Sequence, residues 1–172
     1  MTDWTVELTR MSAAKQLLRE NDTESLWRHE APRTPATPER LQAVERSIGR
    51  TLDSDYASFL LQADGWPAIL QDIDLFGTGE LLGSQVFSEA RELMETLEPE
   101  VLETSNITPE SALPIGASRT GIDMFLMPQA ASGNPAPVIW IAGYEVERYR
   151  TFSDFFRGMI DHNLEEVNDL RT

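Results

Sequence analysis

The chain has 172 residues, of which 41% are hydrophobic. This length is enough for one domain with a full core and is short for two domains. It contains no cysteine, which excludes disulfides, thiolate zinc sites and cysteine nucleophiles. The net charge of −15 argues against binding to nucleic acid or anionic membranes and favours a basic partner. No apolar run approaches the roughly 20 residues that span a bilayer, and the first residues lack the order of a signal peptide. We therefore expect a cytoplasmic protein.

The first part of the chain is predicted to be a helix followed by an extended connection. Helical spacing of apolar residues runs from about Asp3 to Glu20. The side chains that keep this spacing are Trp4, Leu8, Met11 and Leu18. Asp22 can cap a further short helix that ends near Trp27. Three prolines between His29 and Pro38 exclude a helix there and indicate an extended segment laid across the domain.

The segment from Leu41 to Gly65 is predicted to form a hairpin of two short helices with marked ends. The first helix ends at Gly49, because glycine readily takes the left-handed conformation of a helix end. Either Asp53 or Ser54 can cap the second. Both helices are too short to be stable alone, so their apolar stripes must pack against later parts of the chain. We expect Phe59 to be buried where this hairpin meets the sheet.

A strand and a helix are predicted next. Residues 68–76 alternate as a strand does, and glycines follow it. Ser84 can cap a helix with acidic residues on its outer side, which Pro99 ends. A short turn is expected around Val101.

The last part of the chain is predicted to contain strands, a loop and a final helix. The predicted strands are 113–117, 122–127, 138–142 and 146–149. The first two are joined by a short connection that ends in glycine, so they should form an antiparallel hairpin. Residues 128–137 are expected to be a mobile polar loop, and residues 153–170 a helix with a strong apolar stripe.

Helices at both ends of a central run of strands indicate an α+β fold, with helices packed around a central, mostly antiparallel sheet. We expect a single domain of residues 37–172. Residues 1–36 are expected to form an N-terminal helical extension packed on that domain.

The acidic residues are concentrated in the middle of the chain, since residues 61–120 hold 11 acidic and 2 basic side chains. Asp72 and Asp74 are two apart in the predicted strand and should project to the same side. They can bind a divalent cation or a cationic partner, or they can belong to an exposed strand face.

Three glutamates of the following helix, Glu89, Glu92 and Glu95, lie along one face. This face is either a solvated surface or an acidic docking surface for a basic protein. Trp66 and the 128–137 loop are further candidates for contact. The predicted partner-binding residues are Asp64, Trp66, Asp72, Asp74, Glu89, Glu92 and Glu95.

No pattern of catalytic residues stands out. The two histidines, His29 and His162, have no second metal-ligand residue at a suitable spacing. The segment from Gly116 to Gly121 places its second glycine one residue too late for a nucleophile elbow around Ser118. Residues 77–83 miss the spacing of a dinucleotide-binding loop in the same way. We therefore expect no catalytic site, no metal and no cofactor.

Taken together, short motifs in a fixed order resemble the SUKH superfamily. The motifs are the helix end at Gly49, Leu52, Asp55-Tyr56, Phe59-Leu60, Asp64-Gly65-Trp66, Leu75-Phe76, Leu113-Pro114-Ile115-Gly116, the strand from Gly121 to Leu126, Val138 to Trp140 and Phe152 to Phe156. The resemblance covers about Thr37 to Asn163. The chain departs from the family pattern at Asp53, where the family often has proline, and at Asp64, where it often has asparagine. Neither change threatens the fold, because aspartate can cap a helix and tolerate a helix end.

The SUKH superfamily comprises bacterial toxin-immunity proteins and the fungal Smi/Knr-type cell-wall regulators. The resemblance implies helices around a mostly antiparallel sheet, no catalytic set, and binding to partner proteins, often a toxin domain encoded nearby. We therefore expect a non-enzymatic immunity protein that binds a basic toxin domain. A housekeeping regulatory or interaction module and a small carboxylate-dependent hydrolase are the alternatives.

Overall fold

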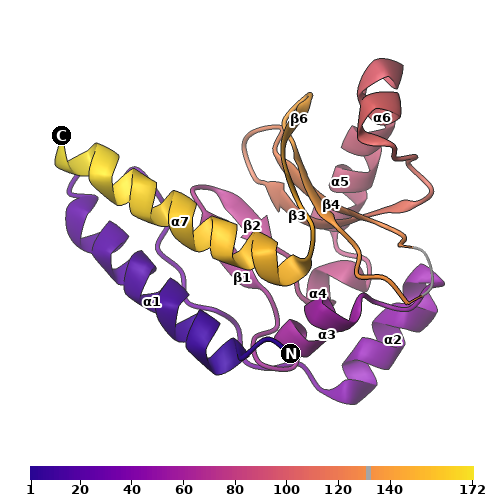
Figure 1. The fold of residues 1–172 in the computed structure, drawn as a ribbon, viewed down its shortest axis with the longest axis horizontal. Coiled ribbons are helices and arrows are strands. Elements are labelled where there is room, and N and C mark those ends of the chain that lie inside the picture. Colours follow the sequence, from indigo (N-terminus) through magenta and orange to yellow (C-terminus); the bar gives the residue numbers. More distant parts are fainter. Residues whose placement is uncertain (131–132) are drawn as a thin grey trace.

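The computed structural model describes residues 1–130 and 133–172, which contain seven helices and one six-stranded sheet (Figure 1). The elements in chain order are α1 (Trp4–Asn21), α2 (Pro38–Ile48), α3 (Ser54–Leu60), β1 (Trp66–Leu70), β2 (Ile73–Leu75), α4 (Thr78–Leu81), α5 (Gln85–Glu95), α6 (Pro99–Ser105), β3 (Ala112–Ser118), β4 (Met124–Pro128), β5 (Val138–Ile141), β6 (Glu145–Tyr149) and α7 (Phe152–Arg171). The predicted α+β class is confirmed. None of the helices in these residues is long and apolar enough to cross a membrane.

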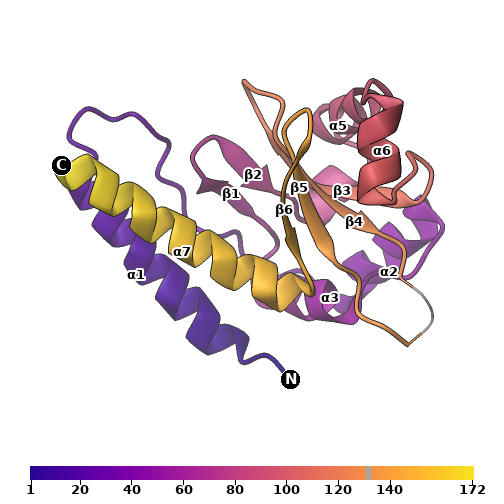
Figure 2. The same cartoon turned by 45° about the horizontal axis from the view of Figure 1, so that its top comes forward.

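The sheet is a simple meander. Its strands lie side by side in chain order, and every neighbouring pair is antiparallel. Short connections join β1 to β2, β3 to β4 and β5 to β6, whereas α4, α5 and α6 lie between β2 and β3. The predicted hairpin of β3 and β4 is confirmed. Helices α1 and α7 lie on one side of the sheet, and α5 and α6 lie on the other (Figure 2).

The α2–α3 hairpin forms as predicted, because each of its helices carries a local start or stop signal. Gly49 ends α2 with a φ of 73°. The side chain of Asp53 caps α3 by accepting from the backbone N–H groups of Asp55 and Tyr56. Phe59 is fully buried, as expected.

One aromatic cluster joins the two ends of the chain to this hairpin. The ring of Trp4 in α1 lies 5.3 Å from that of Phe59 in α3 and 5.4 Å from that of Phe156 in α7. The Trp4 indole also donates to the Ser58 hydroxyl at 2.8 Å. Helix α1 therefore belongs to the same core as the sheet and packs along α7 in both ribbon views (Figures 1 and 2).

Strand β1 forms one edge of the sheet, so one side of its backbone has no neighbouring strand. The chain's only lysine binds carbonyl groups of β1 instead. The Lys15 amine donates to the carbonyl oxygens of Ala68 at 2.6 Å and Ile69 at 3.2 Å. It also donates to the side-chain oxygen of Asn163 at 3.2 Å, and the Asn163 amide donates to the Ile69 carbonyl. An edge strand normally leaves such groups open to other chains. Here α1 and α7 close the edge.

Burial beside these carbonyls lowers the pKa of Lys15 to about 8, and the positive charge of Arg28 adds to the effect. Lysine therefore closes the edge at a cost in electrostatic free energy, which its three hydrogen bonds reduce.

Two secondary-structure predictions are wrong. Residues 68–76 form the hairpin of β1 and β2 instead of one strand, because Gln71 takes a left-handed conformation with a φ of 52°. The short helix after Asp22 does not form. The Asp22 carboxylate accepts from the backbone N–H groups of Leu26 and Trp27, which closes a turn. Helix α4 was not predicted, and α6 is longer than the turn expected around Val101.

Candidate functional site

The predicted acidic contacts divide into an inner group, whose carboxylates are bound by donors of the fold itself, and an outer group, whose carboxylates are exposed. Asp64 belongs to the inner group. Its carboxylate accepts from the backbone N–H and the hydroxyl of Thr78, both at 2.6 Å, and so fixes the start of α4. Glu80 completes the same turn by accepting from the N–H of Gly77 at 3.0 Å and pairing with Arg33 at 2.6 Å.

Asp74 is the most enclosed carboxylate of the inner group, with 4% of the residue exposed. It accepts from Arg28 at 2.6 Å, from Arg119 at 2.8 Å and from the N–H of Ala68 at 2.7 Å. Burial alone would raise its pKa, but the donors from Arg119, Arg28 and Ala68 outweigh burial and hold the pKa below its usual value. Its charge is therefore balanced within the protein.

Asp72 lies in the β1–β2 turn and does not share a strand face with Asp74. Its carboxylate accepts from the Ser118 hydroxyl at 2.7 Å and from the backbone N–H and hydroxyl of Thr120. Burial opposes ionisation, yet the donors from Thr120 and Ser118 lower the pKa of Asp72. Asp72 therefore ties the β1–β2 turn to the β3–β4 turn.

Trp66 is also internal. Its side chain is in the core with 1% exposure, and its indole N–H donates to the Glu30 carbonyl at 3.0 Å. A partner that meets the folded protein cannot reach this ring. We therefore leave Asp64, Trp66, Asp72 and Asp74 out of the proposed binding surface.

The outer group lies on α5 and α6, which together form an acidic arm, defined here as residues 85–105. The exposed carboxylates of the arm are those of Glu89, Glu92, Glu95, Glu98, Glu100 and Glu103. Its one basic residue, Arg91, lies over the ring of Phe87, 4.8 Å from the centroid. The arm is therefore strongly negative along its length.

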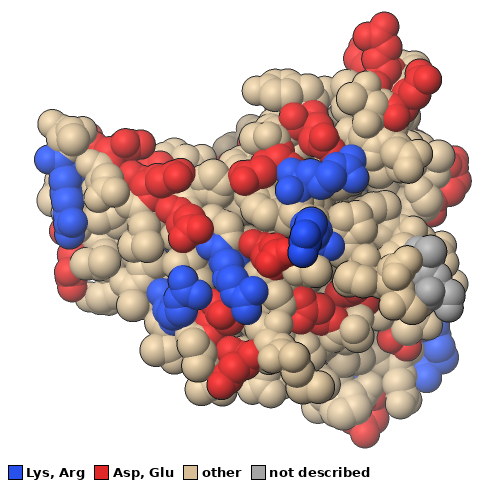
Figure 3. Space-filling view, in the orientation of Figure 1, with Lys and Arg blue, Asp and Glu red and all other residues tan. Residues whose placement is uncertain are grey.

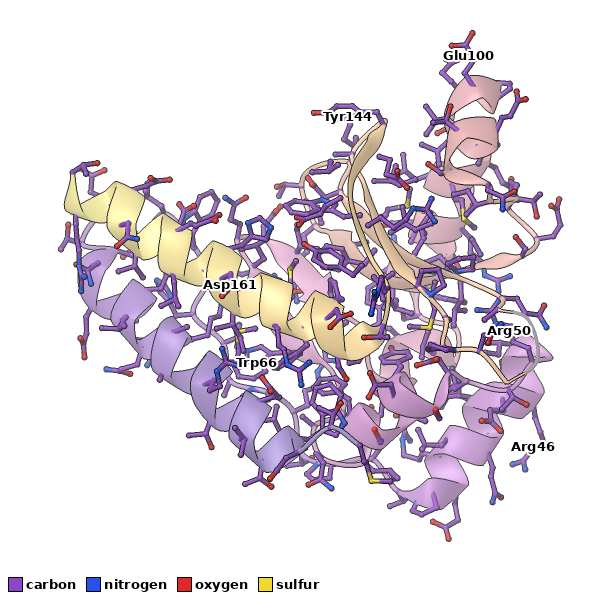
Figure 4. All side chains as sticks on the ribbon, in the orientation of Figure 1. Arg46, Arg50, Trp66, Glu100, Tyr144 and Asp161 are labelled. Atoms are coloured by element: carbon purple, nitrogen blue, oxygen red, sulfur yellow. The ribbon has the colours of Figure 1, made fainter. Side chains whose placement is uncertain are left out.

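The arm has this form because α5 is amphipathic and is followed by proline. Phe87, Ala90 and Met94 face the core, so the glutamates at the intervening positions face solvent. Pro99 starts α6 in a new direction at its first turn. Figure 1 shows α6 projecting from the body of the protein, Figure 3 shows acidic side chains at its outer end, and Figure 4 places Glu100 at its tip.

The histidines are held by carboxylates. His29 lies 2.8 Å from the Asp22 carboxylate, and His162 lies between Glu147 at 2.9 Å and Glu165 at 3.0 Å. In the part of the chain that the structure describes, no three His, Cys, Asp or Glu side chains are placed to hold a metal ion.

The 128–137 loop was a further candidate for partner contact. Its residues 131 and 132 lie outside the described part of the chain, as does the prediction of mobility for them. The rest of the loop lines a hollow of about 720 Å³ beside Arg50. Arg50 donates to the carbonyls of Ser111, which precedes β3, and Met127 in β4, so its guanidinium is already bound by the backbone beside the loop.

Comparison with protein families gives a match to the SMI1 / KNR4 family (SUKH-1) over residues 35–158. No curated protein matches the chain significantly. The matched segment contains the acidic arm and all six strands of the described sheet, whereas α1 and the part of α7 after residue 158 lie outside it.

Proposed function

Because the chain belongs to the SMI1 / KNR4 family (SUKH-1), we propose that it is an immunity protein that neutralises a bacterial toxin by direct binding. The family generally consists of non-catalytic domains of the immunity type. The observation that carries the proposal for this chain is the acidic arm, where six exposed glutamates fall within residues 89–103. The arm is the proposed contact surface, and Glu89, Glu92 and Glu95 are its central residues.

Electrostatics gives the arm its role. A toxin that acts on nucleic acid needs Lys and Arg around its active cleft to hold phosphates. An acidic projection is attracted to the same side chains and can cover the cleft, which blocks the substrate without any chemical step. Complementary charge accelerates encounter more than it deepens affinity, so the arm should act mainly on the association rate. We propose no catalytic residue, metal or cofactor.

The test uses the toxin domain encoded by the neighbouring gene, purified in an inactivated form. The double variant Glu92→Lys, Glu95→Lys should slow association by on the order of tenfold at low salt, and the loss should shrink as salt rises. The control is Glu24→Lys, Glu39→Lys, which changes the net charge equally at exposed positions outside the arm. Equal association rates for the two variants would remove the arm from the interface.

Failure of the wild-type protein to bind that toxin would leave the alternative of a housekeeping interaction module. A thermal-shift screen against divalent metals and hydrolase substrates addresses the remaining alternative, a small carboxylate-dependent hydrolase. We expect no shift in that screen, because the carboxylates of Asp72 and Asp74 are already occupied by donors of the protein itself.

A further inference from the structure

Two hairpin tips expose large apolar side chains that the fold does not bury. Ile122 lies in the β3–β4 connection and is 53% exposed, while Tyr144 lies in the β5–β6 turn and is 66% exposed. Val146, near the start of β6, is 40% exposed. The tips adjoin, since a side-chain carbon at Gly143 would lie 3.5 Å from the end of Ile122. We call Ile122, Tyr144 and Val146 the tip patch.

The turn does not need the tyrosine ring. Gly143 supplies the left-handed residue, with a φ of 77°, and the N–H of Ala142 donates to the carbonyl of Tyr144 to close the turn. Both are backbone features that a small polar residue at position 144 would preserve. A large aromatic side chain at an exposed turn therefore contributes little to folding and is available for contact.

The tip patch lies beside the acidic arm. Arg148 in β6 donates to the carbonyl of Ser105, the last residue of α6, at 2.7 Å. Glu145, the residue after Tyr144, pairs with the same arginine at 2.6 Å, so Arg148 links the β5–β6 turn to the end of α6. The ribbon views place the β5–β6 tip beside the acidic arm, next to α6 in Figure 1 and next to α5 in Figure 2, and Figure 4 shows Tyr144 and Glu100 projecting at the same end of the molecule.

We propose that the tip patch is the anchor for the partner that the acidic arm attracts, with the Tyr144 ring filling an apolar pocket that is bordered by Lys and Arg side chains. This inference rests on the proposed function and names a second part of the same surface. Tyrosine is enriched among the residues that dominate binding energy, and a charged rim beside such a residue sets the encounter rate. The arm therefore governs association, and the tip patch governs dissociation.

Charge excludes the other occupants of this surface. A second copy of the chain would bring its own acidic arm and a net charge of −15 to the contact. Nucleic acid and anionic lipid carry negative charge as well, and the arm would repel them. A basic protein is the partner that can approach the tip patch and gain from its neighbours.

The experiment measures binding to the same inactivated toxin domain. Tyr144→Ala should raise the dissociation rate about thirtyfold and leave the association rate within twofold of wild type. Tyr144→Phe should keep wild-type dissociation, because the ring and not the hydroxyl fills the pocket. The control is Leu26→Ala, which truncates a side chain of similar exposure, 51%, outside the tip patch. It should change neither rate.

The outcomes separate this inference from the proposed function. A wild-type protein that does not bind the toxin domain overturns both. Binding that Tyr144→Ala weakens by less than twofold overturns the tip patch alone. Loss of binding in Leu26→Ala as well as in Tyr144→Ala would also overturn it, because the effect would then be one of folding. The midpoint of thermal unfolding, expected to be unchanged in all three variants, checks this point.

Discussion

The inner carboxylates and the acidic arm have the same chemistry but opposite surroundings. Asp74 meets two arginines and a backbone N–H, and the pKa of its carboxyl falls below its usual value. Glu92 and Glu95, about twenty residues later, are exposed on a helix whose only basic residue lies over a phenylalanine ring. Acidic residues that are close together in the sequence therefore do not necessarily form an exposed acidic surface. The donors that the fold supplies decide which carboxylates hold the structure together and which remain free to attract a partner.

The largest effect that should separate the two groups is on stability. Asp74→Asn keeps the shape of the side chain but removes its charge, which takes the carboxylate from Arg119 and leaves Arg28 with only the more distant Glu30, 4.0 Å away. We expect a loss of on the order of 2–4 kcal/mol in the free energy of unfolding. The matched change in the arm, Glu95→Gln, should alter it by less than about 0.5 kcal/mol. Urea unfolding measures both, and equal losses would show that the division into inner and outer carboxylates is wrong.

The wild-type protein and Asp74→Asn should also differ in how their free energy of unfolding depends on pH. The lowered pKa of Asp74 means that its contribution is present above its ordinary pKa of 3.8 and is lost as pH falls through the folded value. The wild-type protein and Asp74→Asn should therefore converge in stability as the pH drops below about 4, which urea unfolding at a series of pH values measures.

The sequence predicted those elements whose signals are local. Thr37, Gly49 and Asp53 each act on the few residues beside them, so the α2–α3 hairpin could be read correctly. The β1–β2 turn could not, because Ala68 and Gln71 adopt left-handed conformations that neither residue type favours. Their conformations are held by tertiary contacts, including the bond from Ala68 to Asp74.

The site was predicted in part for the same reason. The acidic arm follows from helical spacing, which is local. The partners of Asp74 lie 46 residues earlier and 45 residues later in the chain, so the sequence could not show that its charge is balanced. The tip patch depends on the alignment of two hairpins. A usable signal was present, since Ile122 and Tyr144 each directly follow a turn glycine, where a small polar residue is the usual choice.

A second test concerns the buried charge of Lys15, which is bound by carbonyl and amide oxygens. Between its folded pKa of about 8 and its ordinary value of 10.5, Lys15 carries its proton in the unfolded chain but not in the folded one. Stability should therefore rise with pH from about 8 to 9.5, by at most about 1.4 kcal/mol per unit from this group. The buried Tyr56 hydroxyl, whose pKa is raised, opposes the trend only near and above its ordinary pKa of 10.0.

Comparison with Lys15→Met isolates this contribution, because the variant removes the titrating group. Its stability should be flatter over the same range, and parallel curves would contradict the lowered pKa. Since Lys15 is the only lysine in the chain, lysine-selective isotope labelling gives a single side-chain signal, whose titration by NMR measures the pKa directly.

The smallest expected effect on stability concerns the arm itself. Glu92 and Glu95 are one helical turn apart and repel each other, so Glu92→Gln, Glu95→Gln should leave the free energy of unfolding unchanged or raise it by a few tenths of a kcal/mol. Carboxylates that do not stabilise the fold are available for another role, and the one we propose is attraction of a basic partner. The same double variant should therefore slow association with the toxin domain by several-fold at low salt, less than charge reversal does. The control Glu24→Gln, Glu39→Gln should leave the rate nearly unchanged. A protein that is destabilised by neutralising the arm, or one that binds at the wild-type rate, would place these glutamates with the inner carboxylates or with the ordinary solvated surface.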